Sequence, residues 1–206
     1  MTLFDKPADF EAFEQVVQET VERTKIRLLC YCVMPNHWHF LFWPREDGEL
    51  SEAMRWLTVT HSQRWHAHRH TAGTGPIYQG RFKSFPVQSD EHFLTVARYV
   101  ERNAARAKLT PRAEHWRYSS LWHRLRGDDL ATRCLSRWPV AAPADWVRRV
   151  NRPLTAGELD ALRRSVRRGQ PYGSDRWVQR AAGRLGLESS LRPPGRPRKK
   201  TSDASD

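Results

Sequence analysis

Residues 25–43 read KIRLLCYCVMPNHWHFLFW and carry the clearest structural pattern of the chain. Residues 25–34 are rich in apolar and β-forming side chains, which predicts a strand. Pro35-Asn36 is a turn signal, and the run His37–Trp43 predicts the returning strand. The stretch therefore predicts a β-hairpin.

Outside the hairpin, the residue pattern predicts three helices and one further strand. The helices are expected at residues 9–23, at residues 51–70 with Ser51 as the N-cap, and from a Ser89-Asp90 cap to about residue 105. A short strand is expected at residues 82–87. This order indicates an α+β fold, an antiparallel sheet with helices packed on one face.

Past residue 127 the pattern is interrupted by Pro139, Pro143 and Pro153. Short basic helices are expected at residues 156–168 and 174–186. The last fifteen residues are rich in Pro, Arg and Ser and are expected to stay disordered until they bind a partner. We therefore predict three regions: a main domain over 1–126, a helical C-terminal extension over 127–190, and a basic tail over 191–206.

The composition favours a polyanionic partner. Lys and Arg total 35 against 23 Asp and Glu, so the formal net charge of the 206 residues is +12, and neutralised phosphates release counterions. A basic ribosomal protein or a membrane-surface protein would share this composition. No run approaches the roughly 18 apolar residues of a membrane span, no signal peptide opens the chain, and three cysteines make no disulfide framework. We expect no membrane partner and a cytoplasmic location.

His37 and His39 are two residues apart on a predicted strand, so both imidazoles should point to the same face. Trp38, Phe40 and Phe42 should point the other way, toward a core covered by helices. Two neighbouring neutral imidazoles make a partial metal site. The alternative is a pair of strand histidines with ordinary hydrogen bonds.

Cys30 and Cys32 lie on the preceding strand and are also two residues apart. A tetrahedral zinc site of two cysteines and two histidines would make the protein a zinc hydrolase. The alternative is that both cysteines are small buried strand residues.

The helix expected after Asp90 has an apolar stripe with Tyr99 and Asn103 at its shoulder, four residues apart on one side. The stripe consists of Phe93, Val96, Ala97, Val100 and Ala104. A tyrosine hydroxyl can attack phosphorus and conserve the bond energy in a covalent protein–DNA link, provided that a cation or base assists it. The alternative is that Tyr99 only packs.

The segment Arg192–Lys200 (RPPGRPRKK) contains a Gly-Arg-Pro core similar to an AT-hook. Arginine inserted into a narrow minor groove meets enhanced negative potential. Pro194 stands where such hooks usually carry arginine, so a nonspecific basic tail is the alternative.

Four segments together resemble the HUH-type tyrosine transposases, in particular their REP-associated branch. They are Met34–Leu41 (MPNHWHFL), Tyr78–Ser84 (YQGRFKS), Ala97–Arg106 (ARYVERNAAR) and Trp116–Ser120 (WRYSS). The resemblance spans roughly residues 3–125, and the ending Gly195–Lys199 is also common in that branch. A combination of M-P-N-H-x-H with a later Y-x-x-x-N is specific.

The resemblance implies a DNA transposase, an enzyme that acts as a single-strand endonuclease and then rejoins the DNA in a recombination reaction. Its cofactor would be a divalent metal, Mg²⁺ or Mn²⁺. His37 and His39 would be metal ligands, Asn103 a polar third ligand, and Tyr99 the nucleophile that forms a 5′-phosphotyrosine. The partner would be single-stranded or hairpin DNA. The protein could also form a homodimer, and the sequence does not decide its oligomeric state. The expected DNA contacts are Arg81, Lys83, Arg102, Arg106, Arg196, Arg198 and Lys199.

The resemblance also implies a ferredoxin-like sheet. Relatives usually open with a Y-H-V-x-x-R-G strand beside the histidine strand, whereas residues 1–4 resemble the part just after it. We therefore expect an unpaired sheet edge, caused either by a start assigned too late or by a decayed copy. The other function class is a non-catalytic or domesticated nucleic-acid-binding protein, which the basic charge and nine tryptophans would also serve.

Overall fold

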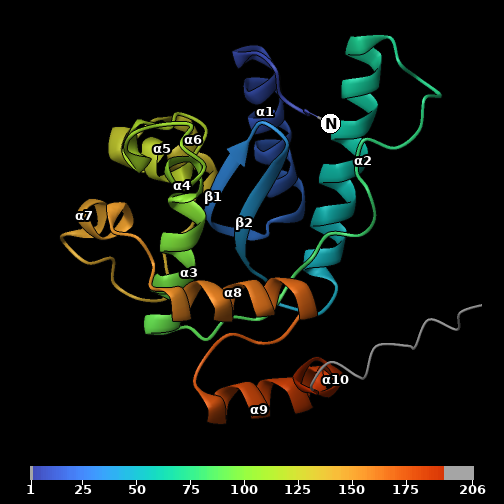
Figure 1. Cartoon of the computed structure of the whole chain (residues 1–206). Helices are drawn as coiled ribbons and strands as arrows, with labels where there is room; N and C mark the ends of the chain where they lie inside the picture. Colours follow the sequence, from blue (N-terminus) through green and yellow to red (C-terminus); the bar gives the residue numbers. More distant parts are fainter. Residues whose placement is uncertain (1, 193–206) are drawn as a thin grey trace, which may run out of the picture.

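The computed structural model describes residues 2–192 and shows an α+β fold, as the sequence predicts (Figure 1). The hairpin strands are β1 (Arg27–Met34) and β2 (His37–Trp43). The longer helices are α1 (Pro7–Thr24), α2 (Glu49–Arg69), α3 (Glu91–Glu101), α8 (Ala156–Arg168) and α9 (Asp175–Leu185). The shorter ones are α4 (Asn103–Arg106), η1 (Ala113–His115), α5 (Ser120–Arg126), α6 (Asp129–Cys134), α7 (Trp146–Asn151) and α10 (Glu188–Leu191). None of the helices within residues 2–192 has the length and apolar character to cross a bilayer.

The hairpin forms where the sequence predicts it. β1 and β2 pair antiparallel from Met34 opposite His37 to Arg27 opposite Trp43, with one irregularity between Leu28 and Cys30. Within the described residues this is a two-stranded sheet. α1 and α2 cover one face of it, where apolar side chains of both helices pack against both strands (Figure 1).

Helices cover the other face as well, so the expectation of helices on one face is wrong. Phe93, Val96 and Val100 of α3 are buried in one cluster with Cys30 and Cys32 of β1. The apolar stripe of α3 can leave water only against this face, which sets the position of the helix. The same cluster includes residues of the C-terminal extension, namely Trp146, Val150, Leu154 and Leu162.

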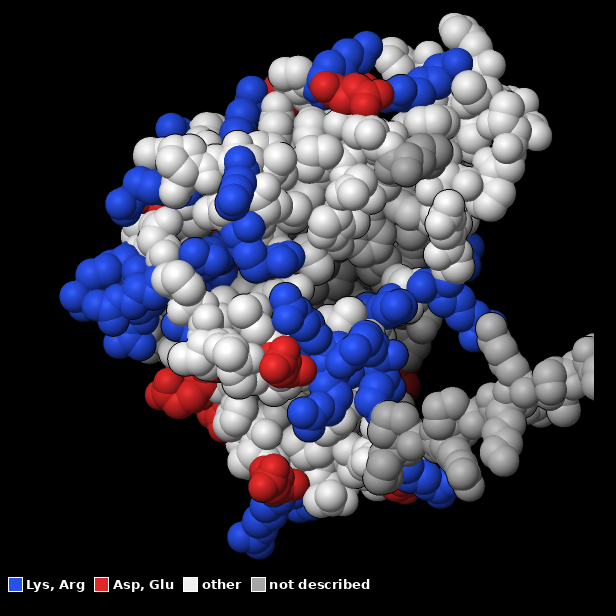
Figure 2. Space-filling view, viewed as in Figure 1, with Lys and Arg blue, Asp and Glu red and all other residues white. Residues whose placement is uncertain are grey.

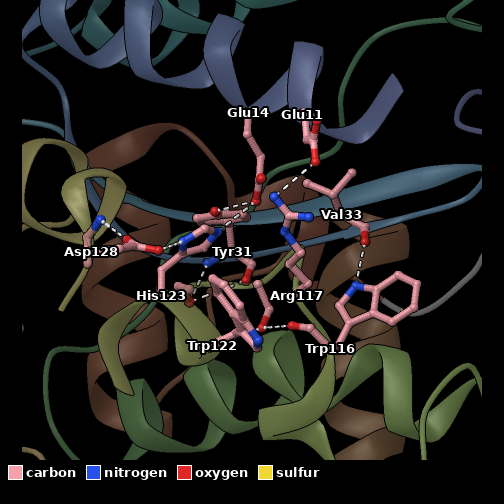
Figure 3. Close-up of polar contacts among 12 residues, drawn as sticks. Glu11, Glu14, Tyr31, Val33, Trp116, Arg117, Trp122, His123 and Asp128 are labelled. Atoms are coloured by element: carbon pink, nitrogen blue, oxygen red, sulfur yellow. Dashed lines mark hydrogen bonds and ion pairs between the residues drawn. The ribbon is translucent and has the colours of Figure 1, made fainter. Parts of the chain in front are cut away.

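Residues 116–138 close the outer edge of β1, and Figure 3 shows Trp116 beside Val33 on that edge. The Val33 N–H donates to the Tyr118 carbonyl at 2.9 Å, and the Tyr31 N–H donates to Ser120 Oγ at 2.9 Å. Trp116 Nε1 donates to the Val33 carbonyl at 2.8 Å. These bonds give hydrogen-bond partners to the backbone groups along an edge of β1 that no strand of the described chain covers.

A buried polar cluster ties the same region to α1 (Figure 3). Glu14 Oε1 accepts from the Tyr31 hydroxyl at 2.7 Å and lies 3.0 Å from His123 Nε2. His123 Nδ1 lies 2.6 Å from Asp128 Oδ2. Burial by itself lowers the pKa of His123, but the hydrogen bonds and charges of Glu14 and Asp128 outweigh it and raise that pKa. Both ring nitrogens of His123 therefore face carboxylate oxygens, an arrangement that favours the protonated imidazole.

Three local predictions are wrong. Residues 82–87 form no strand; Val87 makes a single bridge to Tyr172, and Pro86 has no N–H to offer a ladder. α2 begins at Glu49, not after Ser51, because Gly48 adopts φ +89° as its N-cap. The helix expected to continue to residue 105 is broken at Arg102.

Candidate active site

β2 sets the geometry of the histidine pair. The rings of His37 and His39 lie edge to face with centroids 5.0 Å apart, on the sheet face that α3 covers. Asn36 of the turn places its Oδ1 2.6 Å from His37 Nδ1. An amide oxygen only accepts, so His37 carries its proton on Nδ1 and leaves the Nε2 lone pair free.

His39 has a polar atom without a partner, since its Nε2 is buried and makes no hydrogen bond. Burial, then the charges of His37 and Arg106, lower the pKa of His39 to about 3. Burial and the charge of Arg106 lower the pKa of His37 too. Both imidazoles are therefore neutral at pH 7 and able to offer lone pairs.

α3 brings Tyr99 to this pair. Asp90 caps the helix by accepting from the His92 N–H at 2.9 Å, and the buried stripe orients the helix so that Tyr99 is half-buried at its shoulder. The ring centroids of Tyr99 and His39 are 5.6 Å apart, edge to face. The structure thus places the predicted nucleophile beside one predicted metal ligand.

Asn103 lies one turn further on but is turned to other partners. Its Nδ2 donates to the Tyr99 carbonyl at 3.1 Å, the acceptor that a continuous helix would offer to the Asn103 N–H. Its Oδ1 accepts from Arg106 Nε at 3.2 Å and from Arg106 Nη2 at 2.5 Å. In this arrangement the oxygen expected to ligate a metal is engaged by a guanidinium.

The donors present fit a divalent cation in part. The unpartnered Nε2 of His39 and the free Nε2 of His37 are suitable donors. Over residues 2–192, no three His, Cys, Asp or Glu side chains lie close enough to hold a metal ion together. Cys30 and Cys32 are buried, and burial raises both thiol pKa values, that of Cys32 to about 12. A zinc site of the two cysteines and two histidines is therefore not assembled.

A cavity of about 410 Å³ opens beside the histidines and Tyr99. Its walls are mostly apolar and come from β2, α2, α3, the segment 82–87 and Val166 of α8. Figure 2 shows a hollow near the middle of this face with lysine and arginine side chains gathered beside it. Arg163, Arg164 and Arg167 are the exposed arginines of α8.

The predicted DNA contacts occupy different positions. Lys83 lines the cavity, and Arg81 is exposed on the same segment. Arg106 is exposed, with its guanidinium 5.6 Å from the centroid of the Tyr99 ring. Arg102 is half-buried, and burial with the neighbouring Arg106 and Arg98 lowers its pKa. Arg196, Arg198 and Lys199 lie outside the described residues.

Sequence reasoning missed two features of this site. The sequence pattern predicts only a turn role for Asn36, although its place beside His37 in the motif is a signal for a hydrogen bond to that imidazole. Val166 belongs to the predicted C-terminal extension, and nothing in its local pattern indicates that α8 lines one side of the cavity.

The fold and the basic surroundings of the histidine–tyrosine pair fit a protein that processes DNA, and comparison with known families places it in the class of DNA transposases. Residues 2–103 match the family described as "Transposase IS200 like", and the chain belongs to this family. The match runs from the N-terminus through the hairpin and α3 to Asn103. No curated protein and no solved structure matches the chain.

Proposed function

We propose that the protein cleaves and rejoins single-stranded DNA through a covalent bond between Tyr99 and a 5′ phosphate. The observation that carries this proposal is the approach of Tyr99 to His39, whose buried Nε2 has no partner, at the wall of a cavity that also holds Lys83. A tyrosine that only packs in the core would need neither the unpartnered imidazole of His39 beside it nor Lys83 at the same cavity.

In this proposal, the Nε2 atoms of His37 and His39 hold Mg²⁺ or Mn²⁺, and Asn36 fixes the tautomer of His37. The cation, when bound, polarises the scissile phosphate and stabilises charge on it. Asn103 can add its Oδ1 to this set once that oxygen leaves Arg106.

The reaction exchanges one phosphodiester for another. Tyr99 Oη forms a bond to phosphorus, the bond from phosphorus to the 3′ oxygen breaks, and the phenol proton is passed on to that oxygen. Arg106 and Lys83 supply positive charge for the phosphate oxygens. The free 3′-OH, or that of a new strand, reverses the step and releases Tyr99.

Finer features of the proposal rest on the sequence motifs. We propose that the substrate is single-stranded or hairpin DNA of the kind used by the REP-associated branch, with a homodimer as the oligomeric state to test. The exposed arginines of α8 beside the cavity would guide such a strand.

The test is adduct formation on single-stranded hairpin oligonucleotides with Mn²⁺, read on denaturing gels. Tyr99→Phe should abolish the adduct, because it removes the hydroxyl and keeps the ring. Tyr172→Phe is the matched control, since Tyr172 packs on His92 away from the histidine pair. Tyr78 also lines the cavity, so an adduct that survives Tyr99→Phe and disappears in Tyr78→Phe would reassign the nucleophile.

A second candidate is a DNA-binding protein of the same descent without catalysis. The engagement of Asn103 Oδ1 by Arg106 favours it, because two histidines alone make a weak site for Mg²⁺. In that case the unaltered protein would bind the oligonucleotides and form no adduct under any metal condition.

A further inference from the structure

A buried carboxylate holds the end of α3 that carries Tyr99. Glu101, two residues after Tyr99, is fully buried. Its Oε1 accepts from the Ser120 hydroxyl of α5 at 2.7 Å, and its Oε2 accepts from Trp146 Nε1 of α7 at 2.8 Å. Two residues along a helix differ in direction by roughly 160° around the axis. Glu101 therefore anchors the side of α3 opposite to Tyr99 and leaves the side of the tyrosine open.

Ser120 is itself fixed to the hairpin. Its Oγ accepts from the Tyr31 N–H at 2.9 Å and lies 3.2 Å from the Tyr31 carbonyl. A hydroxyl has one proton, and the shorter distance assigns it to the bond with Glu101. Tyr31 lies on β1, the partner of the strand that carries the histidine pair. The carboxylate thus links α3 to the hairpin that presents the two imidazoles.

Two arginines close to Tyr99 in α3 contact the C-terminal extension. Arg98 Nη2 lies 2.5 Å from Glu158 Oε1 of α8. Arg102, where the helix breaks, directs its Nε to the Asn151 carbonyl of α7 at 3.5 Å. The extension therefore holds α3 before and after the tyrosine, although it lies outside the region that matches the family.

We propose that Glu101 is a positioning residue for Tyr99, and that the extension, through Trp146, completes the geometry of the active site. This inference rests on the proposed function, because it takes Tyr99 to be the nucleophile. α3 ends at Glu101, so no further helical turn holds the tyrosine from behind. A nucleophile has to meet phosphorus in a narrow range of positions, and a displacement of about 1 Å can cost about 100-fold in rate. The two hydrogen bonds of the carboxylate fix the last turn of α3 relative to the histidine strand.

The first test compares two tryptophans. Trp146→Phe removes the N–H that Glu101 accepts and keeps an aromatic ring beside Trp138. Trp116→Phe is the matched control, because Trp116 also donates its indole N–H at 2.8 Å, but to the Val33 carbonyl of β1. At saturating oligonucleotide, Trp146→Phe should slow adduct formation in a single turnover by roughly tenfold or more, with an unchanged Kd for DNA. Trp116→Phe should change neither quantity, and equal rates in the two variants would overturn the proposal.

The second test separates the hydrogen bonds of Glu101 from its charge. In Glu101→Gln the amide oxygen can accept from Trp146, and the amide N–H can donate to Ser120 Oγ. The Ser120 proton then turns to the Tyr31 carbonyl. We expect this variant to form the adduct at the rate of the unaltered protein. A loss as large as that of Trp146→Phe would assign the effect to the charge and overturn the positioning role.

The third test follows Tyr99 without any chemistry. In protein labelled with fluorotyrosine, the fluorine NMR signal of Tyr99 is assigned with Tyr99→Phe. It should shift in Trp146→Phe and stay in place in Trp116→Phe and Glu101→Gln; an unshifted signal in Trp146→Phe would overturn the proposal. A shift in a protein that forms no adduct would keep the link from Glu101 to Tyr99 and remove the proposed catalysis. An adduct that Trp146→Phe forms at the unaltered rate would do the reverse.

Discussion

Replacing Glu14 by glutamine removes the negative charge from the buried cluster on α1, and Glu11→Gln, one turn earlier on the same helix, is the matched control (Figure 3). Glu14 and His123 approach to 3.0 Å with side chains only 6% and 7% exposed. Glu11 and Arg117 approach to 2.9 Å with side chains 47% and 52% exposed. The two pairs have similar geometry and differ in burial.

The difference in burial sets the expected loss of unfolding free energy for each variant. Removing one partner of a buried pair costs about 3–5 kcal/mol of unfolding free energy. Because glutamine can still accept from the Tyr31 hydroxyl, we expect Glu14→Gln to lie near about 3 kcal/mol, at the lower end of that range. The exposed pair should contribute about 0–1 kcal/mol, since solvent screens it. In urea the midpoint of Glu14→Gln should fall by about 1 M or more, given typical slopes of about 1–3 kcal/mol per M.

The loss should depend on pH with a defined sign. The carboxylates outweigh burial and raise the folded-state pKa of His123 above its unfolded value. The stabilisation is then fully present below about pH 6.5 and is lost as the pH rises through the raised pKa. Glu14→Gln should therefore cost most near pH 6 and less near pH 9.

The assay is urea unfolding at both pH values, followed by tryptophan fluorescence. Equal losses for Glu14→Gln and Glu11→Gln would refute the reasoning from burial. A loss for Glu14→Gln that grows with pH would show that His123 is neutral in the folded protein.

Two further predictions concern metal and tail. His37→Ala combined with His39→Ala should lower Mn²⁺ affinity in isothermal titration and abolish adduct formation, while DNA binding persists through the basic surface. An unchanged Mn²⁺ titration would contradict the proposed metal site. Deleting residues 193–206 removes Arg196, Arg198, Lys199 and Lys200, so the slope of log K against log salt should flatten by up to roughly three or four units. In the full chain, Arg196→Ala should weaken binding to A·T-rich duplex more than to G·C-rich duplex if the tail acts as a hook, and equal loss would leave only the electrostatic role.

The elements that the sequence predicts correctly are those with a clear local period. Alternation places His37 and His39 on one face of β2, and the helical stripe from Phe93 to Val100 places Tyr99 at a shoulder of α3. The two basic helices of the extension also appear close to their expected residues, as α8 and α9. Each of these patterns is a property of neighbouring residues and needs no knowledge of the rest of the chain.

The errors arise where the backbone finds a partner other than the one that the local pattern suggests. Residues 82–87 have strand-like composition, yet they line a cavity and pair only at Val87. The helix after Asp90 breaks at Arg102, while the Asn103 side chain bonds the Tyr99 carbonyl. In both places the backbone has an alternative partner that local propensity does not report.

The hairpin, the faces of its strands and the helical position of Tyr99 could all be read from the residue pattern, because the hydrophobic period fixes which side of an element is apolar. The approach of Tyr99 to His39, with ring centroids 5.6 Å apart, depends on packing between distant segments. That approach follows from burying the stripe of α3 against Cys30 and Cys32. Tertiary packing also closed one sheet edge with residues 116–138 and left the other beside a cavity. Burial and hydrogen bonding between residues far apart in the chain choose which surfaces meet, and no local pattern contains that information.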